Sequence, residues 1–296
     1  MVSIVIPAHN EEQVIERLLG QLVPSREASD FDIIVVANGC SDNTVKVAET
    51  FKPLVRVVSI PIASKRRALE IGNLAARGFP RLYVDADVEL RAEDARILAE
   101  ALSCPGTLAA APMRIHSMTG RTRWVRWYYD IWKRLPEVQR GLFGRGVVGV
   151  SATGYKRIAD LPPLLADDLA ASLMFSPDER AVVTDARVVV HPPRTLADLL
   201  RARTRAAMGT DQIEQTGNAP SSTARTRPAD LLRIACRHPH LTPRVVLFLA
   251  VALLARRRAR RVIAQSGYSA WLRDNSSRTH TATGSSPSAD THALRM

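Results

Sequence analysis

Short hydrophobic runs alternate with amphipathic segments along the first 112 residues. The runs have the length and β-branched content of buried strands: Ser3–Ala8, Asp32–Ala37, Val55–Ile60, Arg81–Val84 and Leu108–Pro112. Between them, apolar residues recur every three or four positions, which is typical of helices with one buried face. The predicted helices are Glu11–Leu22, Asn43–Phe51, Lys65–Ala76 and Arg91–Leu102. This alternation predicts an α/β fold with a mostly parallel sheet covered by helices on both faces.

The pattern becomes less regular after residue 112. We expect an aromatic helix over Arg121–Arg134 and a glycine-rich segment over Gly141–Gly154. A short helical run (Leu169–Phe175), one or two strands (Glu179–Val190) and a basic helix (Thr195–Met208) should follow. The helix Arg121–Arg134 places Trp124, Trp127, Tyr128, Ile131 and Trp132 on one face. That face either packs into a core or forms a platform for an acceptor or a lipid.

Polar groups follow three of the predicted strands directly. These groups are His9–Glu11, Asn38–Thr44 and Asp85–Asp87. Because ligands bind outside the carboxyl ends of the strands in such sheets, we expect the three groups on one rim. Asp85 and Asp87 stand on alternate residues, and two carboxylates so placed can hold a divalent cation that bridges a diphosphate. An alternative is that they only end the strand or cap a helix.

Four ordered motifs carry a resemblance to a known family. They are Pro7-Ala8-His9-Asn10-Glu11, the segment Asn38–Thr44, Lys65-x-x-Ala68-x-x-x-Gly72 and Asp85-Ala86-Asp87. This set resembles the donor half of family 2 glycosyltransferases of the GT-A fold, and the resemblance covers Val2 to about Met208. It implies transfer of a sugar from a nucleotide-diphosphate sugar to a hydroxyl acceptor, with a divalent cation (Mn²⁺ or Mg²⁺) and inversion at the anomeric carbon. A uridine nucleotide is expected before a guanosine one. A lipid-linked acceptor is one alternative, which the aromatic face of Arg121–Arg134 suggests and the resemblance does not.

The resemblance assigns the nucleotide contacts to the first two motifs. Pro7, Ala8 and Glu11 match the segment that lines the base and the ribose. Asn38 stands where the family often has Asp, at the position of a uracil contact. Asp42 matches the second acidic position and is expected to order its loop or reach the base. An alternative for Asp42 is a helix N-cap.

The resemblance also places the diphosphate and the metal. Lys65 matches a basic residue near the nucleotide, where an ammonium group would offset phosphate charge, although a solvated helix lysine is the alternative. Asp85 is expected to face the ribose or the metal, and Asp87 to ligate the metal. His191 is a further metal-ligand candidate, with a loop histidine as its alternative.

The acceptor half resembles the family less closely. Asp167 and Asp168 occupy the place of the acidic pair whose second member acts as the general base, so Asp168 is favoured. An N-cap pair is the alternative. Arg201 and Arg205 share a helix face where many relatives carry Gln-x-x-Arg-Trp, which is absent here. They are expected to contact the diphosphate or the product, unless they form a solvated basic face.

The positive charge lies almost entirely in the last third of the chain. The 296 residues carry a formal net charge of +12, and residues 191–296 contribute 17 Arg and 6 acidic residues. There, the apolar run Val245–Ala255 precedes five arginines in positions 256–261. Eleven apolar residues are too few to span a bilayer, so the segment is expected to contact an anionic membrane surface. A helix docked on the catalytic domain is the alternative. No motif favours a nucleic acid partner.

These features define the expected organisation and location. Residues 1–215 are predicted to form the GT-A-like domain, with 1–112 as the donor half and 113–215 as the acceptor half. Residues 216–227 are a linker, 228–272 a basic and apolar helical extension, and 273–296 a disordered tail. Three scattered cysteines and a strand-like N-terminus favour a cytoplasmic protein, peripheral on the inner face of the cell membrane. The alternatives are a sugar-1-phosphate nucleotidyltransferase and a non-catalytic nucleotide-sugar-binding scaffold.

Overall fold

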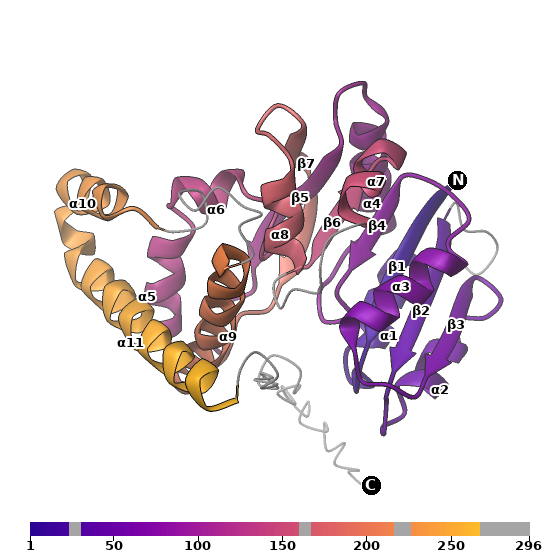
Figure 1. The fold of residues 1–296 in the computed structure, drawn as a ribbon, viewed down its shortest axis with the longest axis horizontal. Coiled ribbons are helices and arrows are strands. Elements are labelled where there is room, and N and C mark those ends of the chain that lie inside the picture. The colour runs from indigo at the N-terminus through magenta and orange to yellow at the C-terminus, as the bar shows by residue number, and fades with distance from the viewer. Residues whose placement is uncertain (24–30, 160–166, 216–225, 267–296) are drawn as a thin grey trace, which may run out of the picture.

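A seven-stranded sheet forms the centre of the computed structural model, which describes residues 1–23, 31–159, 167–215 and 226–266 (Figure 1). The strand order is β3-β2-β1-β4-β6-β5-β7. The strands are β1 (Val2–Ala8), β2 (Phe31–Asn38), β3 (Val55–Ile60), β4 (Arg81–Val84), β5 (Ala109–His116), β6 (Val147–Val150) and β7 (Arg180–Val190). Only β6 runs antiparallel to its neighbours, β4 and β5. The prediction of a mostly parallel sheet is confirmed.

Helices cover both faces of this sheet. On one face, α1 and α4 bury their apolar sides against β1, β2 and β4 in the main core. On the other face, α3 packs on β1 and β2, while α7 and the segment after α8 pack near β5 and β6. The first eight helices are α1 (Ile15–Leu22), α2 (Thr44–Glu49), α3 (Lys65–Ala75), α4 (Ala92–Ser103), α5 (Arg123–Trp132), α6 (Pro136–Arg140), α7 (Ala152–Ala159) and α8 (Asp167–Met174).

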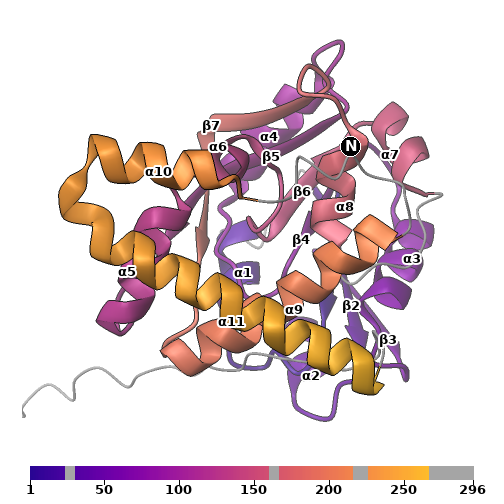
Figure 2. The same ribbon diagram turned by 60° about the vertical axis from the view of Figure 1, so that its left-hand side comes forward.

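The C-terminal helices form a second core with α5. They are α9 (Leu196–Gln215), α10 (Pro228–Arg237), the 3₁₀ turn η1 (Pro239–Leu241) and α11 (Thr242–Ser266). The α11 helix packs along α5 and α9, and this contact is visible in both views (Figures 1 and 2). Its buried residues recur at helical spacing, and Phe248 stacks on Tyr128 with ring centroids 4.8 Å apart. Arg244 also forms an ion pair with Asp130 of α5. The predicted extension therefore packs against the predicted domain.

The expectation of one or two strands over Glu179–Val190 is confirmed by the strand β7, whose register against β5 shifts between Pro112 and Met113. Two other segments differ from the sequence expectations. Part of the glycine-rich segment is strand β6, and α7 follows it where no helix was expected. Helix α11 is 25 residues long, so the apolar run is only its middle. Within the described residues, Pro239–Gln265 is long and apolar enough to cross a membrane. The length argument against a span is thus removed, although one side of the helix packs on protein.

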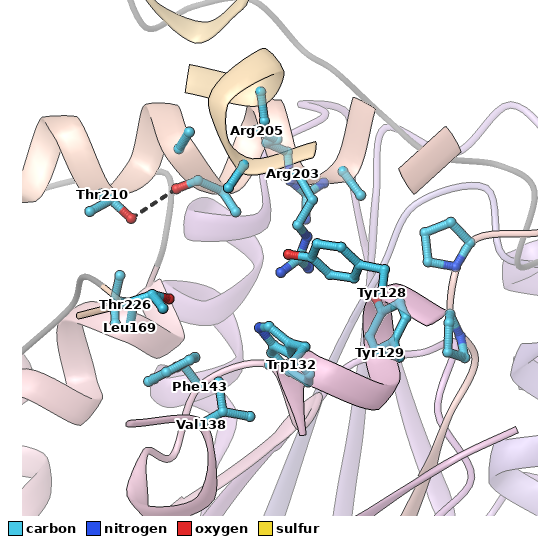
Figure 3. Close-up of a pocket in the computed structure, with 18 of the residues that line it drawn as sticks. Tyr128, Tyr129, Trp132, Val138, Phe143, Leu169, Arg203, Arg205, Thr210 and Thr226 are labelled. Carbon is cyan, nitrogen blue, oxygen red and sulfur yellow. Dashed lines mark hydrogen bonds between the residues drawn. The ribbon is translucent and has the colours of Figure 1, made fainter. Parts of the chain in front are cut away.

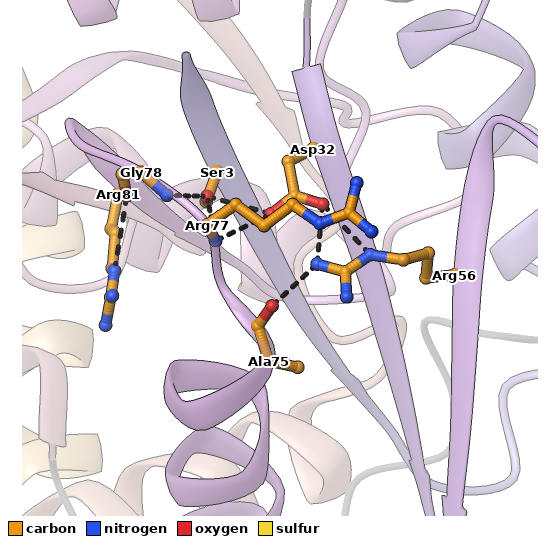
Figure 4. A network of polar contacts seen from close by, with 7 residues as sticks. All are labelled: Ser3, Asp32, Arg56, Ala75, Arg77, Gly78 and Arg81. Carbon is orange, nitrogen blue, oxygen red and sulfur yellow. Dashed lines mark hydrogen bonds and ion pairs between the residues drawn. The ribbon is translucent and has the colours of Figure 1, made fainter.

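A buried polar network fixes the amino ends of the central strands (Figure 4). The Asp32 side chain, only 3% exposed, pairs with Arg56 at 2.6 Å. It also accepts hydrogen bonds from the Ser3 hydroxyl at 3.0 Å and from the Arg77 amide at 2.9 Å. Ser3 in turn accepts from the Gly78 amide. The network therefore ties β1, β2, β3 and the segment before β4 together at the edge remote from the strands' carboxyl ends.

We expect Asp32→Asn to lower the free energy of unfolding by about 3 kcal/mol, because a buried ion pair that loses one partner leaves the other charge uncompensated. Denaturant titration with an unchanged m-value measures this loss. Glu49→Gln is the control, since the exposed Glu49–Lys52 pair should contribute at most about 1 kcal/mol. Equal losses in the two variants would contradict a stabilising role for the buried network.

Candidate functional site

The carboxyl ends of β1, β2 and β4 meet at one edge of the sheet, as the parallel pairing of these strands requires. The loop after β1 and the loop after β2 hold each other by side-chain-to-backbone hydrogen bonds. Asn10 accepts from the Ser41 amide at 2.8 Å, and Glu12 accepts from the Asn43 amide at 2.9 Å. The Thr44 hydroxyl accepts from the Glu11 amide at 2.7 Å. The first two sequence motifs thus form one connected rim.

Asp42 lies at the centre of this rim. Its carboxylate accepts hydrogen bonds from the amide and hydroxyl of Thr44 and from the Glu12 amide, at 3.0, 2.5 and 3.2 Å. Burial alone would raise the pKa of Asp42, but these hydrogen bonds outweigh it and hold the pKa below its ordinary value. Helix α2 begins at Thr44, with Asn43 as its N-cap residue. Asp42 therefore orders the loop, which is one of its two expected roles.

The other nucleotide-contact candidates are buried at the strand ends. Pro7, Ala8 and Glu11 have little exposed surface. Asn38 is 2% exposed, and its amide group donates to the Ala8 carbonyl at 2.8 Å, so it ties β2 to β1. Its side-chain oxygen is buried and has no hydrogen-bond partner among the described residues. The structure does not test a uracil contact by Asn38, which stays a prediction.

Asp85 and Asp87 lie directly after β4, as expected. Lys65, at the start of α3, pairs with Asp85 at 2.8 Å, and both side chains are more than two-fifths exposed. An exposed pair of this kind contributes at most about 1 kcal/mol, so a ligand can separate it at little cost. Among the described residues, no three His, Cys, Asp or Glu side chains form a ready-made metal cluster. The predicted set of Asp85, Asp87 and His191 is therefore not preassembled.

His191 directly follows β7 and donates from Nε2 to the Glu89 carboxylate at 2.7 Å. Glu89 also accepts from Gln21, and the Arg17 guanidinium lies 3.4 Å away. Burial lowers the pKa of His191 despite the Glu89 carboxylate, which favours a neutral imidazole. A neutral imidazole whose Nε2–H faces a carboxylate keeps Nδ1 as a possible ligand atom. Sequence reasoning missed Glu89 because its partners come from β7 and α1.

Gly146 fixes the position of the acidic pair. The Asp85 amide donates to the Gly146 carbonyl at 2.7 Å, which extends the β4–β6 pairing by one step. Gly146 has a φ of +66°, and a Cβ there would lie 2.3 Å from a Val88 methyl group and 3.6 Å from an Asp85 carboxylate oxygen. A side chain at residue 146 is therefore excluded by both conformation and space.

A cavity of about 500 Å³ opens beside Asp85 and Asp87. Figure 3 shows part of its lining. Aromatic and apolar side chains of α5, α6 and α11 form much of its lining, among them Tyr128, Tyr129, Trp132, Val138 and Phe248. The predicted aromatic face is confirmed in part: Tyr128 and Trp132 are buried in the second core and also line the cavity, whereas Trp124 is exposed. Tyr129 was not on the predicted face, yet it lines the cavity too.

Two arginines anchor the loop that borders the cavity. Arg145 is buried and donates to the carbonyls of Pro112 and Gln139, both at 2.9 Å. Burial lowers the pKa of Arg145 to about 10, so it stays charged near neutral pH. Arg114 donates to the Phe143 carbonyl at 3.0 Å and lies over the Trp132 ring at 4.6 Å. The segment between α6 and β6 is thus held by charged hydrogen bonds.

His116 is a cavity residue that sequence reasoning missed. Its ring packs against Tyr129 and Trp132, with centroids 4.8 and 5.5 Å apart. Burial, followed by the nearby Arg114 and Arg203 charges, lowers the pKa of His116 to about 4. The cavity thus contains a neutral imidazole at neutral pH. No local motif marks His116, since β5 was expected to end at Pro112.

The acceptor-half candidates divide into three outcomes. Asp167 and Asp168 are the first residues of α8, but their side chains lie outside the described part of the structure; the next residue, Leu169, lines the cavity. Arg205 lines the cavity as well. Arg201 does not, because it forms an ion pair with Asp198 at the start of α9. Arg203, between them, reaches from α9 toward Tyr128 and Trp132 (Figure 3).

Comparison with known proteins gives a family match and partial relatives. The family described as Glycosyl transferase family 2 matches residues 3–159. A dolichyl-phosphate beta-glucosyltransferase of Drosophila melanogaster is 34% identical over 98 residues, covering 29% of this chain and 30% of the relative. One from Trichomonas vaginalis is 30% identical over 107 residues, covering 32% and 33%. The matches span about a third of these curated relatives.

Two solved structures share the fold. The mannosyltransferase PcManGT from Pyrobaculum calidifontis, in complex with GDP-Man and Mn²⁺, has a TM-score of 0.58 at 18% identity over 91% of this chain and 76% of its own. The glucosyl-3-phosphoglycerate synthase from Mycobacterium tuberculosis, in complex with Mn²⁺, UDP-glucose and phosphoglyceric acid, has a TM-score of 0.54 at 21% identity over 75% and 81%. At these identities the likeness concerns the fold.

We expect Gly146→Ala to destabilise the protein by about 2–4 kcal/mol and to weaken nucleoside diphosphate binding, because the added methyl group pushes on Val88 beside Asp85. Gly106→Ala is the matched control: Gly106 also has a positive φ, +89°, but a Cβ there meets open space. It should lose about 1–2 kcal/mol and bind normally. Denaturant titration and calorimetry measure the two effects. Equal nucleotide affinity in both variants would contradict the link between Gly146 and the acidic pair.

Proposed function

Since this chain belongs to glycosyl transferase family 2, we propose that it transfers a sugar from a nucleotide-diphosphate sugar to an acceptor, with inversion at the anomeric carbon. The observation that carries the proposal is the position of Asp85 and Asp87: they follow β4 at the carboxyl edge of the sheet and line the cavity. The donor would lie at this edge, with the nucleotide along Pro7, Ala8, Glu11, Asn38 and Asp42.

We propose a uridine nucleotide as the donor base. The two similar structures differ in this respect, since one contains GDP-Man and the other UDP-glucose. Lys65 would leave Asp85 and pair with the diphosphate, because the exposed Lys65–Asp85 pair is weak in the absence of a ligand. Asp85 would then be released toward the ribose or the cation.

The donor set fits a divalent cation. Asp85 and Asp87 offer the hard carboxylate oxygens that Mg²⁺ and Mn²⁺ prefer, and diphosphate oxygens of the donor would complete the coordination. His191 would join through its other ring nitrogen, Nδ1, with Glu89 fixing its orientation. When bound, such a cation neutralises the charge that develops on the leaving diphosphate.

We propose that Asp168 is the general base and Asp167 its acidic neighbour. The argument rests on the family register and on Leu169, the next residue of α8, which lines the cavity. A carboxylate there would take the proton of an acceptor hydroxyl as its oxygen attacks the anomeric carbon from the side opposite the diphosphate. Displacement from that side inverts the anomeric centre.

We propose further that the acceptor is lipid-linked and that α11 holds the enzyme on an anionic membrane surface, at the inner face of the cell membrane. The partial relatives are named as dolichyl-phosphate glucosyltransferases. On the side of α11 away from α5 and α9, Val246, Leu249, Leu253 and Leu254 are 42–60% exposed. Arg257 and Arg261 continue the Val246–Leu253 line at intervals of four residues, so apolar and basic groups share one face.

The catalytic assignment predicts opposite results for two variants. Asp87→Asn should weaken Mn²⁺-dependent binding of the nucleotide sugar about tenfold or more, because a cation ligand is lost. Asp168→Asn should bind the donor normally but lose nearly all transfer. A thermal-shift screen of nucleotide sugars with and without Mn²⁺ identifies the donor, and calorimetry and product formation then measure both effects. Glu93→Gln, an exposed change on α4, is the control. Unchanged Mn²⁺-dependent affinity in Asp87→Asn would contradict the metal assignment.

The membrane assignment predicts that the chain pellets with vesicles containing phosphatidylglycerol and far less with pure phosphatidylcholine. Two double variants should each reduce vesicle binding about tenfold. Leu249→Ser/Leu253→Ser removes apolar surface that would be buried in the membrane, and Arg257→Gln/Arg261→Gln removes two arginines that each contribute about 1 kcal/mol near such a surface. Arg66→Gln/Arg67→Gln, exposed on α3, removes the same charge elsewhere and should bind normally. Equal loss in that control, or failure to pellet even at low salt, would contradict the role of α11.

A further inference from the structure

Four arginines from two helices line the same cavity as Asp85 and Asp87. Arg203 and Arg205 come from α9, and Arg256 and Arg260 come from α11. Among the cavity residues of these two helices, the one carboxylate is Asp211. The α9–α11 wall, defined by these five residues, therefore carries a net charge of +3, while the acidic pair lies at the end of β4.

The packing of α11 explains why only some of its arginines reach the cavity. Ala255 and Ala259 are buried, and their small side chains allow close approach to the rest of the protein. Arg256 and Arg260 each follow one of these alanines and lie one turn apart, so they share a side of the helix next to the packed line. Arg257 and Arg261 lie farther round the helix, on the exposed apolar face, and do not line the cavity.

Arg203 is held in place by aromatic rings. Its guanidinium carbon lies 5.8 Å from the Tyr128 ring centroid and 5.5 Å from that of Trp132. Figure 3 shows the side chain extending from α9 toward these rings. A guanidinium already oriented by aromatic rings loses less conformational freedom on binding, and its planar donors match the oxygens of a phosphate group.

The donor does not account for this wall. A donor diphosphate at the β4 end already meets Lys65 and the cation proposed at Asp85 and Asp87. Four further arginines supply much more positive charge than one diphosphate requires, so they fit a second anionic group. Next to them the lining is apolar, with Phe143, Val138, Phe248, Ala252 and Ile263. A ligand that satisfies both parts of the lining has an anionic head and an apolar chain.

We propose that the α9–α11 wall binds a phosphate monoester carried on an apolar chain, as the recognised group of the acceptor. The acceptor hydroxyl of the proposed transfer is then the P–OH of this monoester, whose oxygen bonds to the anomeric carbon as the nucleoside diphosphate leaves. This inference rests on the proposed glycosyltransferase function and names the acceptor's chemical class. Arg256 and Arg260 hold the phosphate together with Arg203 and Arg205, while the apolar lining contacts the first carbons of the chain. The exposed face of α11, with Arg257 and Arg261, lies at the lipid surface from which such an acceptor enters.

Calorimetric titration with hexyl phosphate tests the site without donor, metal or transfer. In the full chain, Arg256→Gln/Arg260→Gln should weaken hexyl phosphate binding about tenfold or more, because two charged hydrogen-bond donors are removed. Arg257→Gln/Arg261→Gln removes the same charge at the same spacing from the same helix and should change the affinity less than twofold. Arg205→Gln, on α9, should also weaken binding, and it keeps the test valid where an α11 variant unfolds.

Two further ligands test the phosphate group and the apolar chain of hexyl phosphate separately. Hexanol should bind at least tenfold more weakly than hexyl phosphate, and inorganic phosphate should also bind more weakly. Equal losses in the two α11 double variants would overturn the proposal, since they would reflect overall charge only. Hexanol binding as tight as that of hexyl phosphate would overturn the phosphate site, and equally tight inorganic phosphate would overturn the apolar part.

A separate titration with the nucleotide sugar and Mn²⁺ keeps the two proposals distinct. Arg256→Gln/Arg260→Gln should bind the donor within twofold of the unmodified chain. Loss of donor binding in this variant would show that the arginines hold the donor diphosphate, and it would overturn the acceptor assignment. Failure of the unmodified chain to bind any nucleotide sugar would overturn the proposed function, while hexyl phosphate binding would still report on the wall.

Discussion

The pairing of β4 with β6 is the constraint on which the site depends. Among the described strands, β6 alone runs antiparallel to its neighbours, and its pairing with β4 joins β1, β2 and β3 to the part of the sheet formed by β5 and β7. The ladder continues past β4 through the Asp85 amide and the Gly146 carbonyl, so the acidic pair is positioned by the same hydrogen bonds that hold the sheet together. Gly149 serves the pairing itself, because a Cβ there would lie 2.5 Å from Leu102 and 2.7 Å from Leu82.

The cavity has acidic side chains at one end and basic side chains at the other, and each end can take part in binding an anionic group. The carboxylates of Asp85 and Asp87 require a cation before they can accept a diphosphate, whereas the arginines of α9 and α11 attract phosphate directly. Between them lie neutral groups, including the His116 imidazole and aromatic rings. This arrangement keeps two anionic groups apart and orients a ligand that is charged at one end only.

The sequence could predict the parts of the site that are local. Asp42, Asp85 and Asp87 each follow a strand whose hydrophobic pattern is clear, and parallel pairing alone brings them to one edge. Other residues depend on packing between distant segments. Glu89 meets His191 only because β7 pairs across the segment after β4, and Arg256 reaches the cavity only because α11 docks on α9. Strand β6 is four residues long and contains a glycine, so neither its existence nor its direction has a strong local signal.

Helix α11 is at once a wall of the cavity and a helix that packs on α5 and α9. Its docking and the occupancy of the cavity are therefore thermodynamically linked. A ligand that contacts both α9 and α11 stabilises the docked helix by the same free energy by which docking strengthens the binding of that ligand. The affinity of the cavity for such a ligand therefore depends on whether α11 is docked, and the docking of α11 depends on whether the ligand is bound.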